Sequence, residues 1–159
     1  MRIAMIKGIA LTLFALVIGA GMSTRAHSAE ANLCRLNVTP LRFGKYNPFV
    51  PGDARGNGSI TYNCTTSSPI SITFEHGTSA SALTRRMSQG AAPLEYNLYL
   101  DAACTMVWGD GTSGTQLFRD SAPRPNTNIT VPIYGCVPSG QRGAVLGTYN
   151  DNFIVTIHY

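Results

Sequence analysis

The residues of this sequence best suited to covalent chemistry are its four cysteines, Cys34, Cys64, Cys104 and Cys136. None of them forms the closely spaced Cys-x-x-Cys pair that is typical of zinc sites and thiol redox motifs. In an oxidising compartment an even number of cysteines predicts disulfide bonds. The sequence therefore predicts two disulfides, and the spacing by itself leaves the three possible connectivities open.

The other side chains give little support to catalysis. A hydrolase would need a nucleophile with a base, paired carboxylates or a metal cluster. His76 and His158 are far apart in the chain. Asp110, within Trp108-Gly109-Asp110-Gly111, resembles part of a calcium loop, but the further acidic ligands are missing, so a tight turn is expected there. We therefore expect no enzyme activity, no metal site and no cofactor.

The first residues indicate the compartment of the cysteines. Arg2 and Lys7 are followed by an apolar stretch from Ile9 to Ile18, and then by small and polar residues. This order predicts a secretory signal peptide over residues 1–29, and the apolar stretch is too short to span a membrane. Cleavage after Ala29 and cleavage after Ala31 both fit. The predicted mature domain, residues 30–159, is exported and does not span a membrane.

Removal of this leader changes the charge of the protein. The whole chain has 12 Lys+Arg and 8 Asp+Glu. Arg2, Lys7 and Arg25 belong to the leader, which leaves nine basic against eight acidic residues. A net charge this close to zero gives no support to nucleic-acid binding.

The elements that must position the cysteines are short β-strands. Apolar and polar residues alternate in six stretches separated by segments rich in Gly, Pro and Asn, and no long helical period occurs. The stretches are 34–38, 60–64, 70–74, 94–100, 129–133 and 153–159. Pro132 predicts an edge position or a bulge in its strand, and Leu83 to Gly90 is the one candidate for a helical turn. The pattern predicts one all-β domain, a sandwich or barrel.

A series of motifs resembles the spore coat protein U domain family, which includes subunits of archaic chaperone–usher pili. Cys34-x-x-x-Val38 and Leu41-Arg42-Phe43-Gly44-Lys45-Tyr46 resemble the opening strand and its Phe-Gly-x-Tyr signature. The others are Gly58-Ser59-Ile60-Thr61-Tyr62-Asn63-Cys64, Arg86-Met87, Leu94-Glu95-Tyr96-Asn97-Leu98-Tyr99, Trp108-Gly109-Asp110-Gly111, Val131-Pro132-Ile133-Tyr134-Gly135 and Gly147-x-Tyr149-x-Asp151. Each motif is weak alone, but their order over nearly the whole mature chain is specific.

The resemblance implies an incomplete immunoglobulin-like β-sandwich that lacks its last strand. The groove left behind exposes core residues and unpaired backbone, and a strand from another chain fills it. The implied partners are a periplasmic pilus chaperone, an outer-membrane usher and a neighbouring pilus subunit that donates a strand. Phe153, Val155, Ile157 and Tyr159 are the expected strand at one wall of the groove, although their alternation also fits a complete sandwich.

The resemblance also implies how the cysteines pair. The family has a disulfide between the cysteines that match Cys34 and Cys64. Cys104 and Cys136 stand where many relatives have other residues, and since both departures occur together we expect a second bridge between them. Exchange of the Cys34 and Cys104 partners is the alternative.

The predicted position in a pilus follows from the segment before Cys34. A shaft subunit needs a donor segment there of about ten or more residues with alternating apolar side chains. Only residues 30–33, or 32–33, lie between the predicted cleavage sites and Cys34. We therefore expect a strand acceptor at the fibre tip, periplasmic during assembly and then on the cell surface, with a role in surface attachment or biofilm formation.

Three apolar loops are the expected contact points of such a tip. They are Phe49-Val50-Pro51, Ala91-Ala92-Pro93 and Ala144-Val145-Leu146. Packing of each loop against the end of the sandwich is an equally good interpretation. For the whole chain the alternatives are a self-complete secreted sandwich that binds carbohydrate or matrix through Trp108 and exposed tyrosines, and a spore or cyst coat protein.

Overall fold

The structure is a computed structural model that describes residues 33–159. The predicted signal peptide and both predicted cleavage sites lie outside the described residues. Within residues 33–159 the regular elements are all β-strands, and none of the described segments forms a helix long and apolar enough to cross a membrane.

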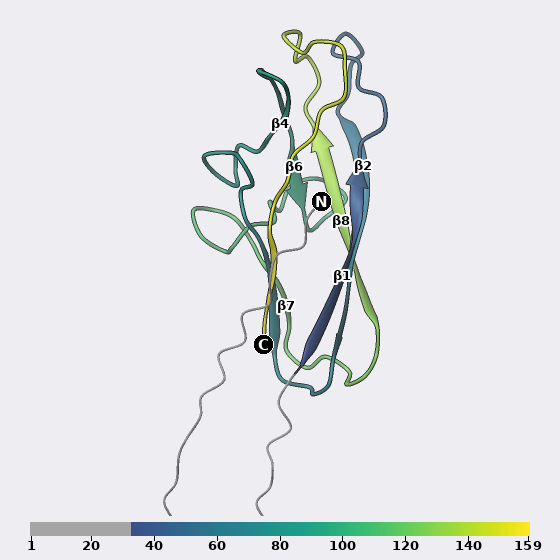
Figure 1. Cartoon of the computed structure of the whole chain (residues 1–159), viewed down its shortest axis with the longest axis vertical. Helices are drawn as coiled ribbons and strands as arrows, with labels where there is room; N and C mark the ends of the chain where they lie inside the picture. Colours follow the sequence, from purple (N-terminus) through teal and green to yellow (C-terminus); the bar gives the residue numbers. More distant parts are fainter. Residues whose placement is uncertain (1–32) are drawn as a thin grey trace, which may run out of the picture.

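The strands form two facing layers and a separate hairpin. In chain order they are β1 (Cys34–Arg42), β2 (Ala54–Cys64), β3 (Ile70–Phe74), β4 (Arg86–Gln89), β5 (Ala92–Glu95), β6 (Asn97–Tyr99), β7 (Phe118–Asp120), β8 (Ile129–Val137) and β9 (Val155–His158). One sheet has the order β1-β2-β8-β6 and the other the order β7-β3-β9, while β4 and β5 pair with each other (Figure 1). This arrangement confirms the predicted open immunoglobulin-like sandwich.

The core lies between the two layers and follows the alternation of the sequence. Ile60 and Tyr62 of β2 are buried on one side, and Ile72 and Phe74 of β3 are buried on the other. Burial of such apolar side chains stabilises a domain by about 25 cal/mol for each Å² removed from water. The period-two pattern thus decided which face of each strand points inward.

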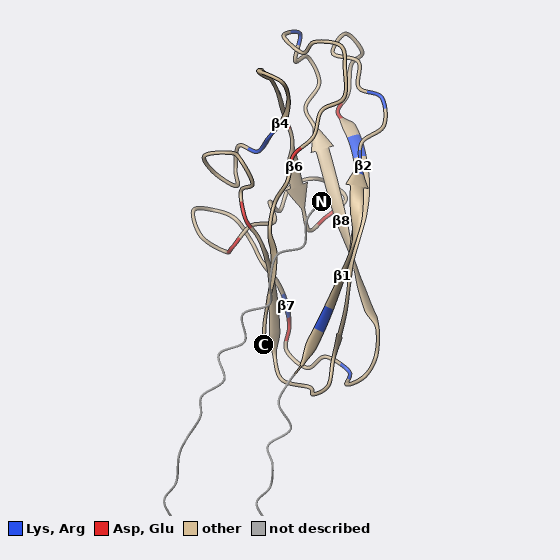
Figure 2. Cartoon of the chain, viewed as in Figure 1, with Lys and Arg blue, Asp and Glu red and all other residues tan. Residues whose placement is uncertain are grey.

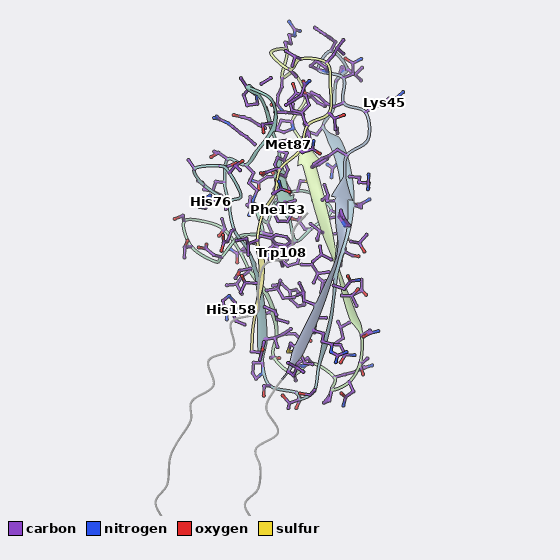
Figure 3. All side chains as sticks on the ribbon, in the orientation of Figure 1. Lys45, His76, Met87, Trp108, Phe153 and His158 are labelled. Carbon is purple, nitrogen blue, oxygen red and sulfur yellow. A yellow bond between two sulfur atoms is a disulfide. The ribbon has the colours of Figure 1, made fainter. Side chains whose placement is uncertain are left out.

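Trp108 lies at the centre of this core. Its side chain is 0% exposed, and its Nε1 donates a hydrogen bond to the Ile72 carbonyl at 2.9 Å. The ring of Phe74 packs edge-on against Trp108, with centroids 4.8 Å apart, and against Phe153 at 5.1 Å (Figure 3). Because Trp108 is enclosed, the interpretation of this residue as a carbohydrate-stacking side chain is wrong.

Both disulfides implied by the family resemblance are present. Cys34 is bonded to Cys64, its direct cross-strand neighbour in the β1–β2 pair. Cys104 is bonded to Cys136 and so joins the loop after β6 to β8. The bonds close loops with sequence separations of 30 and 32 residues.

Two glycines explain why β2 begins earlier than the sequence indicated. Residues 47–58 are rich in turn-forming types, yet β2 already begins at Ala54. β1 has a register irregularity between Thr39 and Arg42, where it crosses closely over β2. A Cβ atom on Gly56 would lie 2.6 Å from the Arg42 carbonyl oxygen, and one on Gly58 would lie 2.9 Å from that of Thr39. These glycines therefore serve a close strand approach rather than a turn.

The segment around Leu94 differs from the single strand that its alternation predicted. It is divided into β5 and β6, which belong to different sheets. Asn97 was expected on the opposite face from the apolar residues but is buried, because its side chain takes part in hydrogen bonds with Arg85 and Leu83. Internal hydrogen bonds here outweigh the alternation of residue types.

Three smaller expectations can be compared with the strands. The candidate helical turn from Leu83 to Gly90 is wrong, since β4 occupies half of it and pairs with β5. β7 carried no recognised signal because it has only three residues. Pro132 faces Ser59 of β2, and β6 pairs with β8 only from Tyr134 to Cys136. At Pro132, therefore, β8 has a described strand partner on one side only, as proline requires.

Candidate functional site: two open sheet edges and a pole of apolar loops

The strand β9 forms an open edge of its sheet. It pairs with β3 through Ile72↔Ile157 and Phe74↔Val155, and no other strand of the described residues pairs with it. Ile157 is buried, whereas Val155 and Phe153 are half-buried and pack against the core. Of the four residues expected in this strand, Val155 and Ile157 lie in β9, Phe153 precedes it, and Tyr159 follows it as an exposed residue.

The opposite sheet also ends in an edge strand. β1 pairs with β2, and among the described strands it has no second neighbour. Leu36 of β1 points toward the core but is only half-buried. Among the described strands, β1 and β9 thus each have a strand neighbour on one side only and carry incompletely covered apolar side chains, which is the arrangement that accepts a further strand.

The segment before β9 is fixed by Asp151. Its carboxylate accepts hydrogen bonds from the Tyr96 hydroxyl at 2.8 Å and from the Thr78 hydroxyl at 3.2 Å. Burial, and secondarily the neighbouring Asp151 carboxylate, raise the pKa of Tyr96 above its ordinary value. The hydroxyl therefore stays protonated and keeps donating, so that the start of β9 is held against the hairpin side of the molecule.

Three loops meet at the end of the molecule opposite the start of β1, and we call them the loop pole. They are residues 43–53, residues 138–150 and the tip of the β4–β5 hairpin at residues 90–91 (Figure 1). Most of the candidate contact residues are exposed here: Phe49 by 73%, Val50 by 54%, Val145 by 52% and Leu146 by 99%. Ala91 is also exposed, but Ala92 and Ala144 are half-buried.

Hydrogen-bonded turns present the two larger apolar tips. The Asn47 side chain accepts from the Phe49 backbone N–H at 3.0 Å, and its carbonyl accepts from that of Val50 at 3.3 Å. In the other loop the Tyr149 hydroxyl donates to the Val145 carbonyl at 3.1 Å and accepts from its N–H at 2.8 Å. The exposed apolar side chains therefore project from defined turns.

Tyr46 and Gln141 join the three loops at their bases. The Tyr46 hydroxyl donates to the Pro138 carbonyl at 2.9 Å and accepts from the Gln141 N–H at 3.1 Å. The Gln141 side chain in turn accepts from the Glu95 N–H at 2.7 Å and donates to the Glu95 carbonyl at 2.9 Å. The sequence motif contained Tyr46, but nothing in the sequence indicated its partner.

The substitution Tyr46→Phe is expected to loosen the loop pole. It removes both hydrogen bonds of the hydroxyl and should lower the free energy of unfolding by about 1–2 kcal/mol. Urea unfolding measures the change, and hydrogen exchange at residues 138–150 should become faster. Tyr159→Phe, at an exposed position, is the control that should change neither. Equal exchange rates in both variants would show that Tyr46 does not hold the loops together.

Arg85 is the important buried residue that the sequence analysis missed. Its side chain is 0% exposed. It donates hydrogen bonds to the Asn97 Oδ1 at 2.7 Å and to the carbonyls of Trp108 at 2.9 Å and Glu75 at 3.1 Å. Burial lowers the pKa of Arg85 below its ordinary value. The neighbouring Arg86, which the motif comparison singled out, is exposed and forms an ion pair with Glu95 at 2.9 Å.

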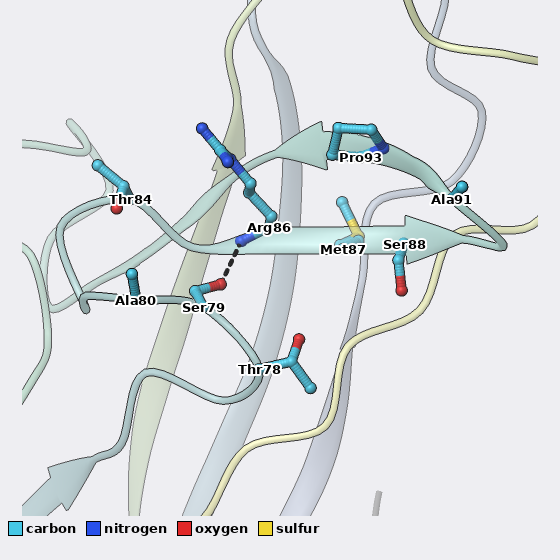
Figure 4. Close-up of a pocket in the computed structure, with 9 residues that line it drawn as sticks. All are labelled: Thr78, Ser79, Ala80, Thr84, Arg86, Met87, Ser88, Ala91 and Pro93. Carbon is cyan, nitrogen blue, oxygen red and sulfur yellow. Dashed lines mark hydrogen bonds between the residues drawn. The ribbon is translucent and has the colours of Figure 1, made fainter.

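A small pocket lies beside the hairpin. It has a volume of about 350 Å³ and is lined mainly by small and hydroxyl side chains together with Met87 and Arg86 (Figure 4). The Ser79 hydroxyl in its wall accepts a hydrogen bond from the Arg86 N–H at 2.8 Å. Since the Arg86 guanidinium is engaged by Glu95, the pocket presents no free charge from this residue.

The tight turn expected at Asp110 is present. Its Oδ1 accepts hydrogen bonds from the Thr112 N–H at 2.9 Å, the Thr112 hydroxyl at 2.8 Å and the Thr115 hydroxyl at 3.2 Å. Hydrogen bonds from Thr112 hold the pKa of this carboxyl below its usual value. Within residues 33–159, no group of three or more His, Cys, Asp or Glu side chains could hold a metal ion.

Comparison with known proteins adds two findings. The sequence profile of the Spore Coat Protein U domain matches residues 22–156. A chain of the crystal structure of the CsuC–CsuE chaperone–tip adhesion subunit pre-assembly complex, from archaic chaperone–usher Csu pili of Acinetobacter baumannii, is similar in fold, with a TM-score of 0.59 and 17% identity. The similarity covers 80% of the present chain and 40% of that chain. Among curated proteins none matches.

Proposed function

Because the chain belongs to the Spore Coat Protein U domain family, we propose that it is a subunit of a surface pilus assembled by chaperone–usher donor-strand complementation. The observation that carries this proposal is the edge position of β9: within residues 33–159 its only strand neighbour is β3, and it carries half-buried Val155 beside buried Ile157. A strand from a partner would complete the sheet through main-chain hydrogen bonds and cover the apolar side chains.

Three partners follow from this role. A periplasmic chaperone fills the groove during export, an outer-membrane usher receives the complex, and a neighbouring subunit then donates the final strand. The named structural neighbour is itself a complex of a chaperone with a tip adhesion subunit, which supports the first of these partners. The protein would be periplasmic during assembly and then located at the cell surface.

Strand uptake can be tested with synthetic peptides of ten to twelve residues, roughly the span of one long strand, with alternating apolar side chains. The purified protein should aggregate alone and gain thermal stability when a suitable peptide binds. Val155→Lys should abolish uptake because it places a charge on the groove side of β9. Thr156→Lys, the adjacent residue of β9, is the matched control. A stable monomer that is indifferent to every peptide would contradict the proposal.

Within the pilus we propose that the chain occupies the tip and attaches to surfaces through the loop pole. The exposed apolar side chains Phe49, Val50, Val145 and Leu146 support this role, because large apolar patches on soluble proteins usually mark interaction sites. Attachment of this kind would promote biofilm formation.

The proposed tip role leads to two expectations, one on surface attachment and one on self-polymerisation. Replacing Phe49 and Leu146 by Ser should strongly reduce attachment to polystyrene beads while the stability changes by less than about 0.5 kcal/mol for each exposed site. Leu83→Ser, at another exposed apolar position, is the control and should attach normally. Unchanged attachment of the double variant would remove the adhesive role, and self-polymerisation of the purified chain through its own N-terminus would remove the tip position.

A further inference from the structure

The largest apolar side chains of the loop pole are strongly exposed. Leu146 is 99% exposed and Phe49 is 73% exposed, so that these side chains touch little of their own molecule. They project from two loops far apart in the sequence that are joined at their bases by Tyr46 and Gln141. A fluid apolar phase can surround such exposed side chains on all sides.

The charge of the pole is positive. Residues 43–53 and 138–150 contain two cations, Lys45 and Arg142, and one carboxylate, Asp53. Asp53 accepts a hydrogen bond from the Ser139 N–H at 3.0 Å, and all three charged residues are exposed, so the two loops carry one more positive than negative charge. Figure 2 shows the basic positions in the upper loops, and Figure 3 shows Lys45 beside the pole. Arg42, at the end of β1, adds a third exposed cation next to these loops.

Apolar tips together with basic side chains match the chemistry of an anionic lipid surface. Apolar side chains enter the acyl boundary of a bilayer, and Lys and Arg interact with the phosphates of acidic lipids. A neutral apolar solid satisfies only the first requirement, since it offers nothing to the cations. The tips are held in hydrogen-bonded turns, so little ordering of the loops would be needed on insertion.

We propose that the loop pole binds membranes rich in anionic lipids, with Phe49 and Leu146 inserted and Lys45 and Arg142 at the headgroups. This proposal rests on the adhesive role given to the pole above and specifies the surface that the pole recognises. It makes Lys45 and Arg142 determinants of specificity, whereas attachment to neutral apolar material depends on the apolar tips alone.

Co-sedimentation of the purified exported protein with vesicles tests the proposal, with a donor peptide bound to keep the protein in solution and a sample without vesicles as the blank. Vesicles of phosphatidylcholine alone are compared with vesicles of phosphatidylcholine and phosphatidylglycerol. The protein should bind the mixed vesicles more tightly, and raising the salt from about 0.1 to 0.5 M should weaken that binding. Lys45→Gln and Arg142→Gln should each lower the partition coefficient for mixed vesicles about fivefold.

Matched controls distinguish vesicle binding through the loop pole from nonspecific binding by other parts of the surface. Arg124→Gln changes an exposed cation in the loop between β7 and β8, at the opposite end of the molecule, and Leu83→Ser removes an exposed apolar side chain elsewhere. Neither should change vesicle binding. If these variants lose as much binding as the pole variants, the membrane is contacted by another part of the surface and the proposal is wrong.

The result also distinguishes this proposal from the adhesive role itself. Attachment to polystyrene that needs Phe49 and Leu146, combined with equal binding to neutral and mixed vesicles, would overturn the lipid proposal and leave the adhesive role intact. If the adhesive role and the lipid proposal are both correct, the double variant Phe49→Ser, Leu146→Ser should lose both polystyrene attachment and vesicle binding. Lys45→Gln and Arg142→Gln should then each show the fivefold effect on binding to mixed vesicles.

Discussion

Arg85→Met is expected to lower the free energy of unfolding by about 3–5 kcal/mol, which is a large share of the stability of a domain of this size. The guanidinium donates to the side chain of Asn97 and to the carbonyls of Trp108 and Glu75, and also to that of Ala82 at 3.2 Å. Methionine fills a similar volume but donates nothing. Several buried acceptors from separate segments would thus lose their partner.

The neighbouring Arg86 provides a matched control. Arg86→Met breaks only the exposed ion pair with Glu95, and exposed pairs contribute at most about 1 kcal/mol. Arg85→Lys should fall between the two, because a single ammonium group retains the charge but not the planar fork of donors. Urea unfolding followed by the fluorescence of Trp108, the single tryptophan of the chain, measures all three. Equal midpoints for the Arg85 and Arg86 variants would refute the structural role of Arg85.

Removal of either disulfide is expected to cost about 3–4 kcal/mol in the chain-entropy description, since each bond closes a loop of about 30 residues. The sequence separations of 30 and 32 are nearly equal, so the double variants Cys34→Ser with Cys64→Ser and Cys104→Ser with Cys136→Ser should lose similar stability. Both should show lower thermal midpoints, measured with and without a bound donor peptide.

The two disulfides differ in what else depends on them. Cys34 at the start of β1 and Cys64 at the end of β2 are both buried in the core, so their loss should weaken the edge strand β1 and also peptide uptake. Cys104 lies half-buried in the loop after β6, away from the edge strands β1 and β9 in sequence, and its loss should leave peptide uptake nearly unchanged. Identical peptide affinities for both double variants would show that β1 does not contribute to the acceptor groove.

The three named residues of the Gly147-x-Tyr149-x-Asp151 motif have different structural roles. In Gly147-x-Tyr149-x-Asp151, Gly147 has a φ of +146°, and a Cβ there would lie 2.1 Å from the Gln89 Nε2 of β4. Tyr149 holds the Val145 backbone, and Asp151 anchors the start of β9 through Tyr96. One short motif therefore links the hairpin, an exposed apolar loop and the segment before β9.

Local sequence determined most of the strands of this protein and, through the order of its motifs, indicated its family. Alternation along β2, β3 and β8 is a property of neighbouring residues, so it could be recognised without the fold. The same holds for the turn at Asp110, whose carboxylate bonds to Thr112, two residues along the chain.

Only the tertiary structure decided which residues meet. Nothing local distinguishes Arg85 from Arg86, yet one is buried among backbone carbonyls and the other is exposed. Tyr46 and Gln141 are 95 residues apart, and Trp108 is enclosed because β3 places Phe74 and the Ile72 carbonyl against it. Such contacts depend on how the layers pack, which no short stretch of sequence contains. The sequence therefore predicted β1, β2, β3, β8 and β9 of the sandwich, whereas packing alone brought the apolar loops to one pole.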